Sequence, residues 1–327
     1  MFFGGISGSA VADAAAMGTI LVPGMTRKGF PPGFSAAVTA ASATMGPIIP
    51  PSILMVLMGV TTGLSIGGLF AAGIVPGLIL GLSMMGLSFF MALRYGFPRE
   101  SFPLSPGIIF KEFVSAVPAL LAPIIILGGI LGGIFTPTES AAVAVLYAFL
   151  LGRFVYKELS FKDLGQIFVE SGTTTAVLLL IIGMANIFAW ILTSEQIPTR
   201  IADAMTALTD NPYLILMIIN VFLLFIGMFL EGGAAIIILA PTLLSVTSAL
   251  GIDPLHFGLV MVLNIAVGLL TPPLGVCLFV VCGVTGISLS RIIRSVLPFL
   301  ALELLVLLLV TYVPSVILWI PGLLGYM

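Results

Sequence analysis

Long runs of apolar residues make up most of the chain, and short polar segments separate them. About ten such runs can be traced, each close to the ~20 residues that a helix needs to cross a bilayer. They cover residues 3–25, 34–62, 65–93, 113–135, 138–152, 173–193, 213–230, 234–249, 255–285 and 296–320. The pattern predicts an all-α polytopic membrane protein, because helices satisfy their own backbone groups in lipid.

One segment, 157–170, has a different pattern. Its apolar side chains fall mostly on one helical face, with charged side chains opposite. These apolar residues are Leu159, Phe161, Leu164, Ile167 and Phe168. We expect an amphipathic helix near 157–170 that lies in the plane of the membrane interface. An ordinary polar loop is the alternative.

The composition agrees with a membrane location. Of the 327 residues, 60% are hydrophobic and 7% are charged, whereas soluble domains carry about 25% charged residues. The net charge of -2 excludes a nucleic-acid-binding surface, so no nucleic acid is expected as a partner. Cys277 and Cys282 lie in apolar sequence and are predicted to pack in the core, not to form a disulfide framework or a metal site.

Two pairs of adjacent prolines interrupt the apolar runs. Pro50–Pro51 lies within 34–62, and Pro272–Pro273 lies within 255–285. Proline has no amide hydrogen and clashes with the preceding turn, so each pair should break a helix inside the membrane. We expect two broken helices whose freed backbone groups bind a cation or an anion. A kink that only shapes the packing is the alternative.

The proline pairs belong to an internal repeat. Glycines and prolines of the first part of the chain recur 222 positions later, as Pro50 does at Pro272. The other matched pairs are Gly29 with Gly251, Pro32 with Pro254, Gly46 with Gly268 and Pro76 with Pro298. Upstream, Asp13 and Glu231 are 218 positions apart, as are Pro23 and Pro241. We therefore expect Asp13 to match Glu231, with four additional residues after Pro241.

Basic residues orient the two copies, because lysine and arginine favour the cytoplasmic side. The loops rich in basic residues, among them Arg27–Lys28 and Arg291 with Arg294, are predicted inside. The loops 194–212 and 250–254 are predicted outside, so 213–249 begins and ends outside as a re-entrant hairpin. The first copy's Gly29–Pro32 loop is then inside and its match in the second copy is outside, so the copies are inverted.

Inverted repeats with two re-entrant hairpins and two broken helices indicate a secondary transporter. The predicted organisation has four parts. They are a first transport-domain repeat (1–64), scaffold helices (65–211), a second transport-domain repeat (212–286) and a C-terminal membrane helix (287–327).

Four stretches resemble the large membrane subunit of the TRAP (tripartite ATP-independent periplasmic) transporters. They are G-G-I-S-G-S-A-V-A-D (4–13), G-P-I-I-P-P-S (46–52), G-G-I-F-T-P-T-E-S-A-A-V-A-V (132–145) and D-P-L-H-F-G-L-V-M-V-L-N-I-A-V-G-L-L-T-P-P-L-G (253–275). The resemblance spans the chain. It implies an elevator-type transporter of the bacterial inner membrane that couples sodium to the uptake of an organic anion, such as a C4-dicarboxylate, a sugar acid or sialic acid.

The resemblance also implies two protein partners, a small four-helix membrane subunit and a periplasmic substrate-binding protein. No cofactor is implied beyond the coupling sodium ions. Compared with its second copy, the chain has almost no residues before its first hairpin tip. We therefore expect that the sequence starts inside the first hairpin, without the N-terminal scaffold helices and that hairpin's entry helix, either as a fragment or through a misplaced start codon.

By the resemblance, each hairpin tip and the break beside it hold a sodium ion through hydroxyl and carbonyl oxygens. The first set is Ser7, Gly8, Ser9, Thr44, Gly46 and Pro47, and the second is Glu231, Gly232, Gly233, Gly268, Thr271 and Pro272. A substrate carboxylate is expected between the tips, near Ser9, Asp13, Pro50, Pro51, Asn264 and Pro273. Turns of small residues, helix-capping acids and a packing asparagine are the alternatives.

Three other polar residues stand out. Thr136 and Glu139 fit a capping box, so we assign Glu139 to structure. His256 is expected to open a helix at the outer surface without a functional role. Glu303 lies inside an apolar run, where a packed protonated acid and a functional acid are both open.

No nucleotide-binding G-x-x-x-x-G-K-[ST] motif is present, so the energy for transport must come from a gradient. A sodium/dicarboxylate symporter that needs no binding protein is the alternative. Such relatives carry Ser-Asn-Thr at each tip, whereas this chain has Ser7-Gly8-Ser9 and Glu231-Gly232-Gly233. An intramembrane enzyme would need a nucleophile and base, or paired acids, placed together, which the single histidine and scattered acids do not indicate. A channel would lack saturable, sodium-dependent uptake.

Overall fold

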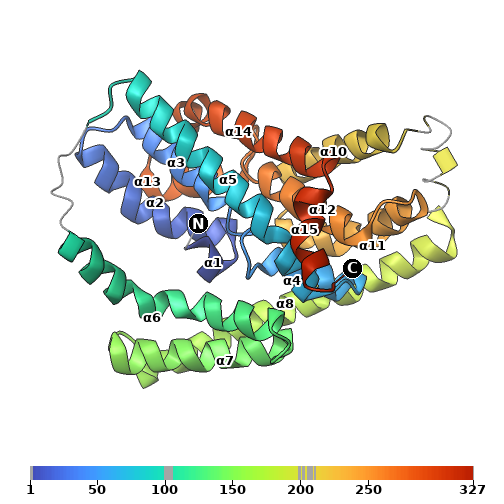
Figure 1. Ribbon diagram of the computed structural model, residues 1–327, viewed down its shortest axis with the longest axis horizontal. Coiled ribbons are helices and arrows are strands. Elements are labelled where there is room, and N and C mark those ends of the chain that lie inside the picture. The colour runs from blue at the N-terminus through green and yellow to red at the C-terminus, as the bar shows by residue number, and fades with distance from the viewer. Residues whose placement is uncertain are drawn as a thin grey trace. The chain divides into compact units, whose positions relative to one another are not determined.

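The computed structural model describes residues 3–98, 106–197, 200, 203, 204, 209 and 211–326 (Figure 1). These residues form helices joined by loops and turns, and they contain no strand. They divide into two units. One comprises the described residues of 3–98 and 188–326, and the other comprises 106–187.

The first copy of the repeat begins the larger unit. Its helices are α1 (Gly4–Ser7), α2 (Ala10–Arg27), α3 (Pro32–Ala43), α4 (Ile53–Thr62) and α5 (Ile66–Arg94). The helices start where the sequence offers caps. Ser9, Ser52 and Ser65 each accept a backbone N–H from the first turn of the following helix. The turn between α1 and α2 requires Gly8, whose φ is 62°.

The second copy follows the same order. Its helices are α10 (Pro212–Phe229), α11 (Gly232–Ala249), α12 (Pro254–Gly268), α13 (Val276–Thr285) and α14 (Leu289–Tyr312), followed by α15 (Ser315–Leu323). The prediction of one continuous membrane helix over the apolar run 296–320 is therefore wrong. The chain leaves the helix at Val313, where its backbone is non-helical, and Pro314 then begins a new one.

The helix boundaries set the register of the repeat. Helices α2 and α11 both have 18 residues, and they begin at Ala10 and Gly232, so the offset of 222 already holds in the hairpins. The predicted match of Asp13 with Glu231 is therefore wrong, since Glu231 corresponds to Ser9 and each residue is an N-cap. The offset of 218 between Pro23 and Pro241 is misleading because both prolines lie inside their helices, where no cap fixes their position.

Beyond the breaks the register shifts by one residue. Helices α4 and α13 both have 10 residues, but they begin at Ile53 and Val276, which are 223 apart. The starts of α5 and α14, Ile66 and Leu289, are also 223 apart. The second break thus holds one additional residue, and the predicted match of Pro76 with Pro298 is wrong by one position.

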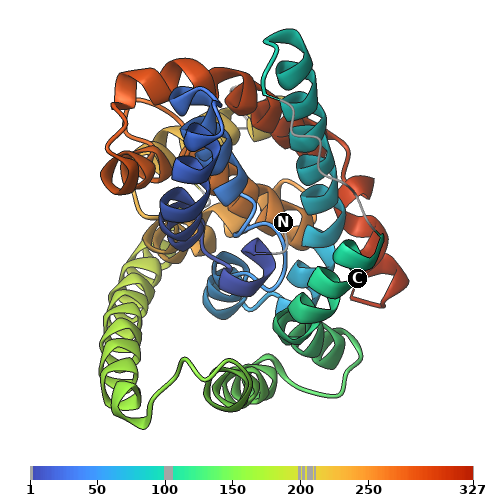
Figure 2. The ribbon, with the colours of Figure 1, turned by 90° about the vertical axis from the view of Figure 1, so that its left-hand side faces the viewer.

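The two copies pack reciprocally in the larger unit (Figures 1 and 2). Helix α2 packs against α13, and its counterpart α11 packs against α4; α3 packs against α14, and α12 against α5. Helix α12 is buried from Leu255 to Gly268 and forms the middle of this core. Each hairpin arm is thus held by the second half-helix of the other copy.

The smaller unit contains α6 (Pro106–Leu131), α7 (Pro137–Leu150), the π-helix η1 (Leu151–Val155) and most of α8 (Phe161–Ser194). Helices α6 and α7 pack together, and the Tyr147 hydroxyl donates to Pro118 O at 2.8 Å. The predicted capping box is confirmed, because Thr136 N donates to Glu139 Oε2 at 2.8 Å and Glu139 N donates to Thr136 Oγ1 at 3.3 Å.

The segment predicted to be a separate amphipathic helix is instead the start of α8. Residues 157–160 are not helical, and from Phe161 the helix continues without interruption to Ser194. The hydroxyls of the polar stretch between its two parts are satisfied within the helix, since Thr173 and Thr174 donate to carbonyls four residues back, at 2.8 and 2.9 Å.

Seven of the described helices are long and apolar enough to cross a membrane. They lie in α5, α6, α7 with η1, α8, α10, α11 and α14. Large apolar side chains such as Phe89, Phe90 and Leu180 are exposed, as lipid contact requires. The chain is therefore an all-α polytopic membrane protein. The runs at 3–25, 34–62 and 255–285 do not form single spans, because each is divided by a tip or a break.

Candidate cation and substrate site

The first hairpin tip lies directly on the first break. Gly8 O accepts a hydrogen bond from Ile53 N, the first residue of α4, at 3.3 Å. A Cβ added at Gly8 would lie only 2.9 Å from Pro51 O. Tip and break are therefore in backbone contact, and Gly8 has no room for a side chain.

Asp13 joins this tip to the break from α2. The Ser7 hydroxyl donates to Asp13 Oδ1, and Asp13 is only 3% exposed. Its other oxygen, Oδ2, packs against Gly46, where an added Cβ would approach it to 2.6 Å. Ser9, in turn, caps α2 by accepting Ala12 N at 3.4 Å. Asp13 thus connects the tip to the break and does not cap a helix.

The first break runs from Thr44 to Ser52, and Pro50–Pro51 is a cis peptide bond. Ser52 bridges it, because its hydroxyl donates to Pro47 O at 2.6 Å while its oxygen accepts Met55 N at 3.3 Å. Thr44, Gly46 and Pro47 are buried. Of the residues predicted for the first sodium site, the tip residues Ser7, Gly8 and Ser9 thus lie against the break, at Gly46 and Pro51. The contacts of Thr44 are with Ala41 and Glu303, and Pro47 O accepts from Ser52.

The second break, residues 269–275, is more open. Pro272–Pro273 is also cis, but Pro273 is exposed and Leu274 is 39% exposed. The Thr271 hydroxyl donates to Val267 O at 2.8 Å, and Cys277 N donates across the break to Leu269 O at 3.0 Å. Thr271 is thus anchored on the last turn of α12.

The second tip differs from the first in its chemistry. The Glu231 carboxylate caps α11 by accepting a hydrogen bond from Ala234 N at 3.0 Å, and Glu231 is exposed. Gly232 and Gly233 are buried against Leu54 and Leu57 of α4. These glycines contact α4 and, through Ile265, α12, whereas Thr271 is held on the last turn of α12 by Val267 O and Gly268 O. The residues predicted for the second sodium site are less closely grouped than those of the first.

Asn264 lies inside the packing of α12, with no exposed surface. Its Nδ2 donates to Asn220 Oδ1 at 2.9 Å and to Asn220 O at 3.1 Å, and Asn220 Nδ2 donates to Thr311 Oγ1 at 2.9 Å. This series links α12 to α10 and α14. Sequence analysis missed Asn220 because a single amide in an apolar run gives no sign of its partner.

Two other predictions concern single residues. His256 opens α12 as expected, but it is not at the surface: it is 2% exposed and its Nε2 lies 3.0 Å from Val310 O. Cys277 is buried, as the predicted packing role requires, whereas Cys282 is only partly buried; both are free thiols.

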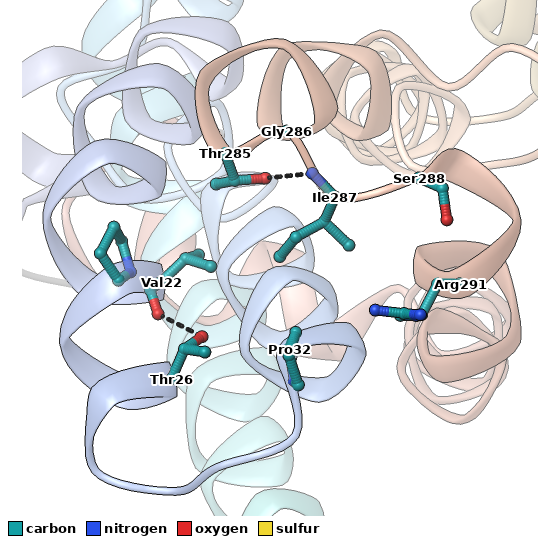
Figure 3. Close-up of a pocket in the computed structure, with 9 residues that line it drawn as sticks. Val22, Thr26, Pro32, Thr285, Gly286, Ile287, Ser288 and Arg291 are labelled. Atoms are coloured by element: carbon teal, nitrogen blue, oxygen red, sulfur yellow. Dashed lines mark hydrogen bonds between the residues drawn. The ribbon is translucent and has the colours of Figure 1, made fainter.

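A cavity of about 510 Å³ lies elsewhere in the larger unit, between the ends of α2 and α13 and the starts of α3 and α14 (Figure 3). Val22, Pro32, Thr285 and Arg291 are among its lining residues. It contains none of the residues predicted to bind sodium or substrate. Its loops carry the basic residues that place this end of the unit on the predicted inner side.

Comparison with known proteins identifies relatives over the whole chain. The family model described as "Tripartite ATP-independent periplasmic transporter, DctM component" matches residues 1–316. The isethionate TRAP transporter permease protein DctMQ of Oleidesulfovibrio alaskensis is 45% identical over 98% of this chain and 51% of its own length. The chain thus spans about half of that relative.

Two further relatives are covered more fully. The C4-dicarboxylate TRAP transporter large permease protein DctM of Pseudomonas aeruginosa is 43% identical over 99% of this chain and 76% of its own length. The sialic acid TRAP transporter large permease protein SiaM of Vibrio cholerae is 42% identical over 100% of this chain and 76% of its own length.

Proposed function

Because the chain belongs to the DctM component family of the tripartite ATP-independent periplasmic transporters, multi-pass permeases of the bacterial inner membrane and not enzymes, we propose that it carries out sodium-coupled uptake of an organic anion. The observation that most supports this proposal is the backbone contact of Gly8 with Ile53, with Asp13 behind it.

The first tip and break offer what a sodium ion needs. Sodium favours several oxygen ligands, which carbonyls of an unwound segment and hydroxyls supply. Ser7, Ser9 and Thr44 provide hydroxyls, and the segment from Thr44 to Ser52 provides carbonyls that no regular helix uses. A carboxylate at Asp13 would balance the positive charge of the ion in a site from which water is excluded.

The substrate is proposed to bind between the second break, before α13, and the two tips, whose contacts are with the first break, α4 and α12. Helix N-termini attract anions through their free N–H groups and dipole. Gly275 at the start of α13 contributes no side-chain cap. Cys277 N and Leu278 N already donate to Leu269 O and Gly275 O, so Val276 N is the group of that turn proposed to face the anion. Isethionate, C4-dicarboxylates and sialic acid, named for three relatives, are all anions, which favours an organic anion here too.

The proposed mechanism couples the two ligands through the tips. Sodium neutralises Asp13 and fixes the first tip on its break, and the ordered tip completes the anion site. The two hairpins and half-helices would then move together past the remaining helices, as an elevator. The carrier moves across the membrane only with both sodium and the anion bound or with neither bound. The sodium gradient therefore drives the uptake of the anion.

Two partners are proposed, a small membrane subunit and a periplasmic binding protein. The name DctMQ of one relative and the word tripartite in the family description support them. A symporter that works without a binding protein is the second candidate. Its relatives carry Ser-Asn-Thr at each tip, so the tips Ser7-Gly8-Ser9 and Glu231-Gly232-Gly233 argue against it.

The test uses the natural full-length subunit in proteoliposomes, with its small subunit. Uptake of labelled succinate, isethionate and N-acetylneuraminate is measured under an inward sodium gradient or an equal potassium gradient, with and without the binding protein. We expect one substrate to accumulate only with sodium and the binding protein. Accumulation that is equal in potassium would exclude sodium coupling, and accumulation without the binding protein would favour the second candidate.

A further inference from the structure

Glu303 is an acid buried in the middle of α14, at 1% exposure. Its Oε1 lies 2.7 Å from Thr44 Oγ1, the first residue of the first break. Its other oxygen, Oε2, is buried and has no hydrogen-bond partner among the residues that the structure describes. Burying a carboxyl group in such a place costs free energy. An acid inside a membrane-spanning helix therefore indicates a functional role.

The hydrogens around Thr44 can be assigned by counting. Its hydroxyl has one hydrogen, but Oγ1 lies 2.6 Å from Ala41 O and 2.7 Å from Glu303 Oε1. A carbonyl oxygen can only accept, so the Thr44 hydrogen is directed at Ala41 O and the Glu303 carboxyl donates to Oγ1 as a neutral acid. One lone pair of Thr44 Oγ1 is then left for a further ligand.

The repeat provides an internal comparison for this contact. At the offset of 223, Glu303 corresponds to Leu80 of α5, and at the offset of 222 Thr44 corresponds to Ala266 of α12. Both counterparts are buried, at 1% and 0% exposure, and α5 packs against α12 as α14 packs against α3. Packing at this crossing therefore does not require an acid or a hydroxyl. The pair is specific to the first break.

We infer that Glu303 is a positioning residue for the first sodium site. It fixes Thr44 Oγ1 against α14, with the hydroxyl hydrogen turned away, so that the free lone pair is presented to the cation. The inference rests on the proposed sodium coupling and extends it by a residue outside both tips and both breaks. Such support is what keeps a ligand within the narrow geometry that a cation site needs.

The test measures how sodium raises the melting temperature of the purified full-length protein, with potassium at equal ionic strength as reference. Glu303→Leu should raise the half-saturating sodium concentration about tenfold, and Thr44→Val should raise it similarly. Glu303→Gln, whose amide can donate to Thr44, should stay within about twofold of the wild type. The double variant should be no worse than Thr44→Val, because Glu303 acts through Thr44.

A matched control lies on the same helix. Thr311→Val removes a buried hydrogen bond of α14 to Asn220, so it should lower the melting temperature without changing the sodium midpoint. If Glu303→Leu does not fold, Glu303→Asp withdraws the acid by one methylene and should still raise the midpoint.

An unchanged midpoint in Glu303→Leu or Glu303→Asp, or effects that add in the double variant, would overturn the inference. A wild-type protein that sodium does not stabilise more than potassium would instead overturn the proposed sodium coupling, and the inference with it.

Discussion

Gly227 of α10 and Gly268 of α12 meet backbone to backbone. A Cβ added at Gly268 would lie 2.7 Å from Gly227 Cα and 2.8 Å from its carbonyl carbon. Neither atom can move without shifting a helix, so the arm of the second hairpin is seated directly on the last turn before the second break.

The first prediction concerns this contact. Gly268→Ala should destabilise the protein by about 1–3 kcal/mol or more, because the methyl group overpacks two backbones. Gly86→Ala in α5 is the control, since nothing lies within 4 Å of its added Cβ, and alanine favours a helix by about 1 kcal/mol over glycine. Thermal unfolding in detergent measures both. A Gly268→Ala protein as stable as Gly86→Ala would show that the two helices do not meet this closely.

The second prediction separates charge from geometry at Asp13. Asp13→Asn keeps the contact with Ser7 but removes the negative charge, so the half-saturating sodium concentration should rise about tenfold, equivalent to about 1.4 kcal/mol. Ser7→Ala keeps the charge and removes the hydrogen bond, and should have a smaller effect. Sodium-dependent uptake measures both variants. Equal effects in the two variants would mean that the carboxylate serves only to hold the tip.

The third prediction is for Asn264. Asn264→Ala leaves the side chain and carbonyl oxygens of Asn220 without their donor, at a cost of about 1–3 kcal/mol. We expect lower thermal stability but an unchanged KM for the transported anion, because Asn264 is fully buried between α10 and α12. A raised KM with normal stability would instead place Asn264 in the substrate site.

The fourth prediction tests the second break. Thr271→Val removes the hydroxyl but keeps the shape, and should raise the sodium concentration needed for half-maximal uptake. Thr285→Val is matched to it, because the Thr285 hydroxyl makes the same kind of bond, to Val281 O at 2.6 Å, at the end of α13. Only the first variant should change sodium dependence. Identical behaviour of the two would leave Thr271 a structural residue.

Features that depend on local chemistry could be predicted from the sequence. Pro50–Pro51 and Pro272–Pro273 break their helices because two successive residues lack the amide hydrogen. Single prolines such as Pro76 and Pro298 are accommodated inside α5 and α14. The capping box at Thr136 and Glu139 follows equally from neighbouring residues. Pro314 likewise indicates the end of α14, but the apolar run continues past it and favoured a single helix.

Features that depend on tertiary contacts could not be predicted. The contact of Glu303 with Thr44 joins residues 259 positions apart, and nothing near either residue points to the other. The register of the hairpins was misjudged because it rests on the caps Ser9 and Glu231, which differ in chemistry, while the similar acids Asp13 and Glu231 do not correspond.

The reciprocal packing of the two copies constrains how the protein is made. Helix α2 is not among the described helices that are apolar enough to cross a membrane by themselves, and it packs against α13, which the ribosome produces more than 200 residues later. During synthesis the first hairpin therefore lacks its contact with α13 until residue 285 has left the translocon. A chain released before that point would leave the α2 surface at Gly18 without Val281 and Val284 of α13, which pack against it in the finished protein.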